Sequence, residues 1–305
     1  MDMDMELIVE ELTKEINKEH VLRNEKMSKH TTFKVGGSVD IFISPSNTKE
    51  LTHAIKICKT FEIPYYVIGN GSNILVKDNG FRGVIIQIYK NFDNVTVDDE
   101  TITAHAGVLL SKLSKIIADE SLEGFEFASG IPGTLGGAVY MNAGAYGGDI
   151  SKVIVSADVI DEQGNIVTLS KEQLELGYRT SIIQKNNYII LSAVLKCRKG
   201  NKEKIREVIN DLNNRRKQKQ PLEFPSAGST FKRPEGYFAG KLIMDSGLKG
   251  YQIGNAQVSE KHCGFIINKG NATAEDIINL IGHVRKVVND KYNVSLETEV
   301  RIIGE

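Results

Sequence analysis

Residues 130–148 form the sequence Gly-Ile-Pro-Gly-Thr-Leu-Gly-Gly-Ala-Val-Tyr-Met-Asn-Ala-Gly-Ala-Tyr-Gly-Gly, which holds seven of the chain's 28 glycines. Ordering so many glycines is costly in conformational entropy, and a run with so few large side chains contributes little to a core. We therefore expect its backbone to lie close to something flat or phosphorylated. The alternative, a mobile loop, is disfavoured by the apolar Ile131, Leu135, Val139 and Met141, which would anchor the segment.

A second glycine turn, Gly69-Asn70-Gly71-Ser72-Asn73, follows a predicted buried strand at 65–68. Consecutive backbone amides in such a turn can form an anion-binding nest, and the side chains of Ser72 and Asn73 add donors. The turn is not a Walker loop, and Ile74 stands where the Rossmann fingerprint requires its third glycine. The turn therefore either binds a phosphate or pyrophosphate, or only ends the strand tightly.

Outward from these two segments, the hydrophobic period alternates between helix and strand, which indicates a mixed α+β and α/β chain. We predict helices at 5–22, 48–61, 108–120, 202–218, 237–246 and 274–290. We predict strands at 39–44, 65–68, 84–88, 101–105, 153–160, 165–169, 188–197, 263–268 and 294–303. The first two strands and helix 48–61 form a β-α-β motif, strands 153–160 and 165–169 form a hairpin around Gly164, and Thr273 is the candidate cap of helix 274–290. A polar break at 199–201 predicts a boundary between two domains.

Composition excludes several classes of protein. The 305 residues carry 38 Lys and Arg against 39 Asp and Glu, so no basic surface for nucleic acid is expected. The cysteines Cys58, Cys197 and Cys263 are far apart, which predicts neither disulfides nor a metal site. The N-terminus is acidic and no apolar run approaches the ~18 residues of a membrane span. We expect a cytoplasmic protein.

Six segments carry a resemblance to a known family. They are 30–37 (His-Thr-Thr-Phe-Lys-Val-Gly-Gly), 69–73, 130–148, 177–179 (Gly-Tyr-Arg), 226–234 (Ser-Ala-Gly-Ser-Thr-Phe-Lys-Arg-Pro) and 299–304 (Glu-Val-Arg-Ile-Ile-Gly). In this order they resemble the UDP-N-acetylenolpyruvoylglucosamine reductases, flavoenzymes of peptidoglycan synthesis. The resemblance extends from His30 to Glu305.

The resemblance implies the architecture. It predicts a vanillyl-alcohol-oxidase-type (PCMH-type) FAD-binding domain over 31–199, with two α+β subdomains at about 31–83 and 84–199. A smaller α/β substrate-binding domain is predicted over 200–305, and 1–30 form an N-terminal helix and lead-in.

The resemblance also implies the reaction and its cofactors. NADPH reduces non-covalently bound FAD, and the flavin passes hydride to the enolpyruvyl double bond of the UDP-N-acetylglucosamine enolpyruvate. The 69–73 turn is expected to hold the FAD pyrophosphate, and the 130–148 segment to line the cofactor. The implied cofactor-binding residues are Gly69, Asn70, Gly71, Ser72, Asn73, Ile74, Gly130, Ile131, Pro132, Gly133, Gly136, Gly137, Asn142, Gly144 and Arg301.

Three residues match the family's catalytic positions. Ser229 corresponds to the proton donor, and Arg179 and Glu299 to residues that act on the enol intermediate. Hydride delivery leaves negative charge on the substrate, which a guanidinium can stabilise, and the carbon that becomes carbanion-like needs a proton within hydrogen-bond reach. By themselves these residues would be interpreted as a loop serine, a surface arginine and a strand-end carboxylate.

The implied substrate-binding residues are Tyr178, Arg216, Lys232, Arg233 and His262. Arg216 lies in a basic run that would otherwise be a solvated helix face, although a guanidinium suits a diphosphate. His262 is either a substrate-facing or a structural histidine. The spacing from Gly250 to Asn271 leaves no room for the tyrosine-bearing insertion of the family's other main branch, so Arg216 and its neighbouring loop are the candidate substrate cover.

Two other functions are compatible with such a fold. A related FAD-dependent alcohol or hydroxy-acid oxidase would lack the Ser229, Arg179 and Glu299 set. A non-catalytic nucleotide-sugar binder would have no reason to keep all three. No histidine or cysteine stands in the 69–73 turn to attach a flavin covalently. We expect a monomer that binds only its small-molecule substrates.

Overall fold

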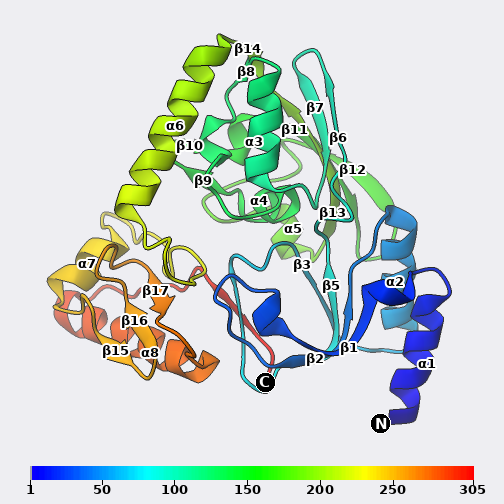
Figure 1. Ribbon diagram of the computed structural model, residues 1–305, viewed down its shortest axis with the longest axis horizontal. Coiled ribbons are helices and arrows are strands. Elements are labelled where there is room, and N and C mark those ends of the chain that lie inside the picture. The colour runs from blue at the N-terminus through cyan, green and yellow to red at the C-terminus, as the bar shows by residue number, and fades with distance from the viewer. Residues whose placement is uncertain (1) are drawn as a thin grey trace. The chain divides into compact units, whose positions relative to one another are not determined.

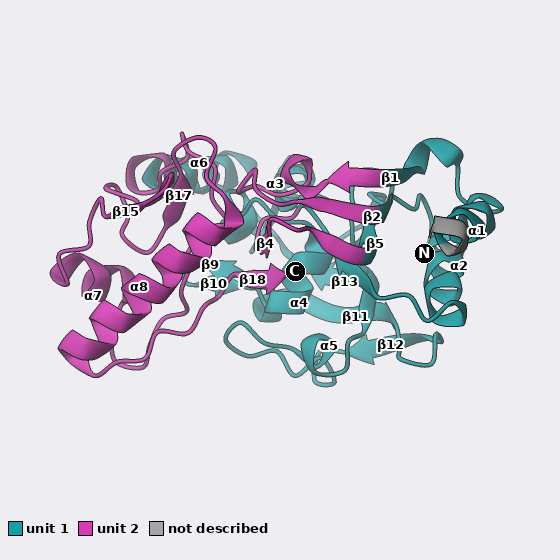
Figure 2. Cartoon of the chain, turned by 90° about the horizontal axis from the view of Figure 1, so that it is seen from below, with its two compact units in different colours: residues 1–23, 41–70, 83–216 teal, residues 24–40, 71–82, 217–305 magenta. Residues whose placement is uncertain are grey.

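The computed structural model describes residues 2–305, and the chain forms two compact units (Figures 1 and 2). The first comprises the chain up to Arg23 together with Ile41–Asn70 and Gly83–Arg216. The second comprises Asn24–Asp40, Gly71–Arg82 and Lys217–Glu305. These units are defined by compactness alone, so the division into ligand-binding domains at 31–199 and 200–305 stays a prediction.

The predicted β-α-β motif lies mostly in the first unit. Strand β2 (Ser38–Ile43) leads into helix α2 (Thr48–Thr60) and then into β3 (Tyr65–Ile68). The sheet has the order β1-β2-β5-β3, with β1 at Val21–Lys26 and β5 at Phe81–Gln87. Because β5 pairs in parallel with β3, the glycine turn emerges at the carboxyl end of a strand with a neighbour along its length.

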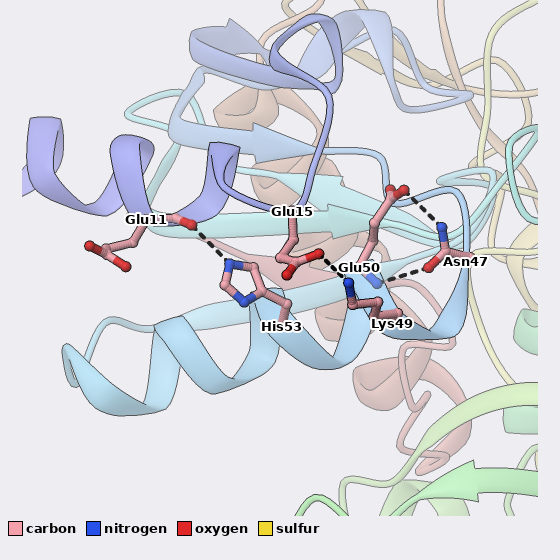
Figure 3. A network of polar contacts seen from close by, with 6 residues as sticks. All are labelled: Glu11, Glu15, Asn47, Lys49, Glu50 and His53. Atoms are coloured by element: carbon pink, nitrogen blue, oxygen red, sulfur yellow. Dashed lines mark hydrogen bonds and ion pairs between the residues drawn. The ribbon is translucent and has the colours of Figure 1, made fainter.

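Helix α1 (Asp2–Thr13) packs on α2, where Ile8 and Leu12 are buried. Figure 3 shows side chains of α2 directed toward α1 and the residues after it: His53 Nε2 lies 2.8 Å from the carbonyl of Glu11 in α1, and Lys49 pairs with Glu15 beyond its end at 2.6 Å. Asn47 caps α2 by accepting from the Glu50 amide.

The prediction of one helix over 5–22 was wrong in its extent. Helix α1 ends at Thr13, and Asn17 starts a 3₁₀ turn, η1 (Lys18–His20), by accepting from the Glu19 amide. Strand β1 then begins at Val21, because these residues pair in the sheet. Tertiary pairing here overrides the helical spacing of the apolar residues.

An antiparallel five-stranded sheet forms the rest of the first unit's core (Figure 1). Its order is β12 (Ile166–Ser170), β11 (Ile154–Ile160), β13 (Ile189–Lys196), β7 (Thr101–His105) and β6 (Val95–Asp98). The predicted hairpin around Gly164 is confirmed by β11 and β12. The first unit also contains α3 (Leu110–Asp119), β8 (Leu122–Glu123), η3 (Glu126–Ala128), β9 (Gly144–Ala145), β10 (Gly148–Asp149), η4 (Ile150–Lys152), α5 (Ile182–Lys185), β14 (Arg198–Lys199) and most of α6 (Lys202–Lys219).

The expectation that 130–148 adds little to the core was wrong. The segment contains a helix, α4 (Leu135–Met141), which packs against β13 and β7. Leu135, Ala138 and Val139 on this helix are buried. Thr134 caps it by accepting from the Gly137 amide at 3.4 Å. The small residues therefore allow a helix to approach a sheet closely.

The second unit has a separate core around α8 (Ala274–Tyr292), with Ile277, Leu280 and Val284 buried. Thr273 and Asp276 form a capping box there, and Asp78 accepts from the amides of the helix's first two residues. The other elements are η2 (Met27–Lys29), β4 (Ile74–Val76), α7 (Ala239–Asp245), β15 (Gln252–Ile253), β16 (Ala256–Val258), β17 (Ile266–Asn268) and β18 (Arg301–Ile303).

The predicted strand over 294–303 was too long. Only Arg301–Ile303 form β18, in parallel with β4. Just before it, Thr298 pairs with Phe231 instead. The segment thus changes partners within a few residues, which a single hydrophobic period does not reveal. Among residues 2–305, no helix has both the length and the apolar character needed to cross a bilayer.

Candidate active site

Two of the predicted cofactor segments meet within the first unit. The side-chain amide of Asn70 donates to the carbonyl of Pro132 at 2.6 Å. Beside it, a Cβ built on Gly69 would lie only 2.2 Å from Thr134 Oγ1. The end of β3 therefore rests directly on the entry to α4.

A cavity of about 100 Å³ opens where these segments meet. Its walls combine backbone edges at glycines with apolar and aromatic side chains. The lining residues include Gly69, Thr134, Gly136, Gly137, Val67, Ile68, Ala106, Tyr140 and Ile190. Such walls suit a flat ring system, so the residues present here fit part of a flavin nucleotide.

The structure shows why some positions in these segments require glycine, for a cause that the sequence did not suggest. A Cβ on Gly136 would lie 2.9 Å from the Cβ of Ala106, and one on Gly71, at φ +63°, would lie 2.0 Å from the His30 carbonyl. These positions need glycine because protein atoms stand beside them. Gly137 also lines the cavity but differs, since a Cβ there would meet nothing closer than 3.7 Å.

Arg179 lies in a loop of the first unit, close to the end of the glycine-rich segment. Its Nη2 donates to the Gly144 carbonyl at 3.4 Å, and its guanidinium lies 5.1 Å from the centre of the Tyr178 ring. Tyr178 is 57% exposed. The backbone of Arg179 adopts φ +55°, which is uncommon for a residue other than glycine.

Arg216, near the end of α6, does not lie on a solvated helix face. A Cβ on Gly130 would lie 3.0 Å from Arg216 Cδ, so this side chain covers the start of the glycine-rich segment. Burial lowers the pKa of the Arg216 guanidinium, and the nearby Tyr146 acts in the opposite direction. Arg215, by contrast, forms an exposed ion pair with Asp211 at 2.7 Å.

In the second unit, a short ladder joins the segment that follows Ser229 to the segment of Glu299. The Glu299 amide donates to the Thr230 carbonyl at 2.8 Å, and the Lys232 amide donates to the Glu297 carbonyl at 2.9 Å. The predicted proton donor therefore precedes a residue bonded directly to the segment that carries the predicted carboxylate. Ser229 is exposed and Glu299 is half-buried.

The same ladder continues into the second half of the glycine turn. Asn73 donates through its side chain to the Glu299 carbonyl at 3.1 Å, and the Arg301 amide donates to the Asn73 carbonyl at 3.0 Å. Arg301 also stands opposite Ile74 in the β4–β18 pair. Predicted cofactor and catalytic residues of this unit are thus neighbours.

The remaining predicted substrate residues all have protein partners. His262 Nδ1 accepts from the Gly264 amide at 3.1 Å, and burial lowers the pKa of its imidazole. Neutral His262 thus carries its proton on Nε2. Lys232 pairs with Glu297 at 2.9 Å, and the Arg233 guanidinium lies 4.6 Å from the Phe238 ring centre.

Sequence reasoning missed Thr230, which is fully buried inside the ladder. Its amide donates to the Gly264 carbonyl, and its hydroxyl accepts from the Ile266 amide at 3.1 Å. It also missed Gln184, whose side-chain amide donates to the Arg179 carbonyl. Both are ordinary polar residues in the sequence, and only their burial against backbone groups distinguishes them.

Comparison with known proteins agrees with this arrangement. Residues 39–170 match the FAD binding domain model, and residues 220–303 match the model of the UDP-N-acetylenolpyruvoylglucosamine reductase C-terminal domain. The chain is 58% identical over 282 residues to the UDP-N-acetylenolpyruvoylglucosamine reductase of Clostridium botulinum (strain Eklund 17B / Type B), covering 92% of each chain. The enzyme of the same name from Alkaliphilus metalliredigens (strain QYMF) is 52% identical over 303 residues, covering 99% of this chain and 100% of the relative.

Solved structures confirm the predicted fold class. The UDP-N-acetylenolpyruvylglucosamine reductase (MurB) of Thermus caldophilus superposes with a TM-score of 0.80 at 34% identity, covering 93% of this chain and 99% of that one. The 4-ethylphenol oxidase of Gulosibacter chungangensis, at 17% identity and a TM-score of 0.51, shares the fold alone over 65% of this chain and 43% of its own. The chain belongs to the UDP-N-acetylenolpyruvoylglucosamine reductase family.

Proposed function

We propose that this chain binds FAD non-covalently and reduces the enolpyruvyl group of UDP-N-acetylglucosamine enolpyruvate to UDP-N-acetylmuramate, with NADPH as hydride donor. The observation that supports the proposal is the ladder from Asn73 through Glu299 to Thr230, because Ser229 directly precedes the residue that binds the Glu299 amide. Bound FAD supplies hydride transfer between the nucleotide and the alkene. The protein's own side chains must handle charge and protons.

Each predicted catalytic residue has a role that its chemistry supports. Arg179 holds the substrate carboxylate through two parallel hydrogen bonds and stabilises the charge that develops on it. Ser229 gives its proton to the substrate carbon that becomes carbanion-like. Glu299, half-buried, acts on the same enol intermediate.

The glycine-rich segments bind the cofactor, and a few cationic side chains bind the substrate. Gly69, Asn70 and the 130–137 segment hold the cofactor around the cavity. Arg216 and Lys232 meet the diphosphate of the substrate, since a guanidinium and an ammonium both pair with phosphate. Lys232 would exchange its exposed contact with Glu297 for that anion. The enzyme acts as a cytoplasmic monomer in peptidoglycan precursor synthesis.

The test follows the colour of the purified protein without oxygen. We expect a yellow protein that NADPH bleaches and that UDP-N-acetylglucosamine enolpyruvate recolours. One UDP-N-acetylmuramate should form for each flavin that is reoxidised. UDP-N-acetylglucosamine, which lacks the alkene, is the matched control and should leave the protein bleached. Bleaching without recolouring by the enolpyruvyl sugar would contradict the proposed reaction. If oxygen, added afterwards, recolours the protein rapidly while the enolpyruvyl sugar does not, the result would point to an oxidase.

A further inference from the structure

The carbonyl of Tyr140, in the last turn of α4, accepts hydrogen bonds from side chains that follow Arg179 in the chain. The last carbonyls of a helix have no partner within it, and Tyr140 supplies one of them in α4. Ser181 Oγ donates to this carbonyl at 2.8 Å and Gln184 Nε2 donates to it at 2.6 Å. Ser181 is fully buried. Two side chains from the far side of the Arg179 loop are therefore fixed to the end of α4.

Gln184 makes a second bond that leads to Arg179 itself. The same Nε2 donates to the Arg179 carbonyl at 3.1 Å. A side-chain amide carries two N–H donors, so one Gln184 can bind both carbonyls. The Arg179 backbone lies in the left-handed region at φ +55°, a conformation that needs support from its surroundings.

The preceding side of the loop is held from the same helix end. Asn142, the residue that ends α4, donates through Nδ2 to the Gly177 carbonyl at 3.0 Å and accepts from the Ser151 amide through Oδ1. Arg179 Nη2 reaches the Gly144 carbonyl two residues further. Backbone on both sides of Arg179 is thus tied to residues 140–144.

We propose that Gln184 is a positioning residue for Arg179: it fixes the arginine's backbone to the end of the glycine-rich helix and so sets where the guanidinium meets the substrate carboxylate. The inference rests on the proposed function, since it needs Arg179 to act on substrate. A merely structural Gln184, which only completes α4, would affect the enzyme regardless of what stands at position 179.

A double-mutant cycle separates these two roles. We would compare Gln184→Leu, Arg179→Ala and the double variant by anaerobic single-turnover reoxidation with UDP-N-acetylglucosamine enolpyruvate after NADPH reduction. Gln184→Leu should slow reoxidation by about 10- to 100-fold, the scale of a misplaced catalytic group. In the Arg179→Ala background it should have no further effect. Reduction by NADPH and flavin content should stay unchanged.

Further variants keep the test sharp. Lys185→Leu is the matched control and should match the wild type, because Lys185, the neighbour of Gln184 in α5, makes only an exposed ion pair with Glu175. Gln184→Glu, which puts an acceptor against two carbonyls, should be slower than Gln184→Leu. Affinity of the oxidised protein for the sugar, followed by the flavin spectrum, should fall with Gln184→Leu only when Arg179 is present.

The outcomes distinguish the two proposals. Three results would each overturn the positioning role. In the first, Gln184→Leu still slows reoxidation in the Arg179→Ala background. In the others, Gln184→Leu slows reduction by NADPH as much as reoxidation, or it reoxidises at the wild-type rate. If a Leu variant does not fold, Gln184→Asn, whose shorter amide cannot reach both carbonyls, takes its place in the cycle. A wild-type protein that the sugar neither recolours nor binds would instead refute the proposed function, and the positioning role with it.

Discussion

The loop of Arg179 and the ladder of Ser229 and Glu299 are held by different kinds of contact. In the first, side-chain amides of Asn142 and Gln184 bind backbone carbonyls. In the second, backbone amides bind backbone carbonyls between Thr230 and Glu299 and between Lys232 and Glu297. One region depends on which side chains are present, and the other largely on strand pairing.

This difference teaches where the enzyme is vulnerable to substitution. A backbone ladder survives most changes of side chain, because the bonded groups belong to every residue except proline. A loop held by two amide side chains loses its geometry when either is replaced. We therefore expect changes in the ladder to affect chemistry only at the reacting group itself, and changes around Arg179 to act at a distance.

The largest expected effect is that of Ser229→Ala. The hydroxyl takes no part in the ladder bonds, so the pairing of Thr230 with Glu299 should remain. Reoxidation of the reduced enzyme by the enolpyruvyl sugar should slow by about 10²- to 10⁴-fold, the contribution of a positioned proton donor. Reduction by NADPH should not change. Stopped-flow measurement of both half-reactions checks this, and equal loss of both would contradict the proton-donor role.

Thr230→Val tests the side-chain bond by which Thr230 accepts from the Ile266 amide. Valine keeps the shape but removes the acceptor of the buried Ile266 amide, which should cost about 1–3 kcal/mol of unfolding free energy. Thr230→Ser keeps the acceptor and should lose less. Urea unfolding measures both variants. A Thr230→Val protein as stable as the wild type would show that this hydroxyl does not support the ladder.

Asn142 separates backbone from side-chain contributions in the Arg179 region. Its φ of +41° suits glycine, so Asn142→Ala should be about 1 kcal/mol less stable than Asn142→Gly. Both variants lose the amide bond to Gly177, so both should slow reoxidation by the sugar to a similar extent. Paired urea unfolding and stopped-flow data test this. A Gly variant with wild-type kinetics would mean that the side-chain amide is dispensable.

The smallest effect is a pH dependence through His262. Burial lowers the pKa of its imidazole in the folded state below the ordinary 6.5, so the unfolded chain binds the proton more readily. Stability from this group is therefore complete above pH 6.5 and is lost as the pH falls below it. His262→Asn, whose Oδ1 can accept from the Gly264 amide, should flatten this part of the stability curve. Urea midpoints between pH 5 and 8 provide the comparison, and parallel curves would exclude the titration.

Much of this molecule was predictable from local sequence. The β-α-β motif ending at Gly69, the hairpin at Gly164 and the helix after Thr273 each follow from periodicity, turn residues and a cap within a short window. The glycines of 69–73 and 130–148 marked the right segments. The expectation that these glycines only make room for a ligand was incomplete, because protein atoms also stand beside Gly69, Gly71 and Gly136.

The sequence by itself predicted which residues carry the chemistry, since Arg179, Ser229 and Glu299 each stand in a motif that resembles the family's. Only the tertiary structure decided how they are held. The bonds from Gln184 to Tyr140 and from Asn73 to Glu299 join residues 44 and 226 positions apart. Such contacts leave no local pattern, because a buried amide and an exposed one look alike in sequence until the fold brings a carbonyl to one of them.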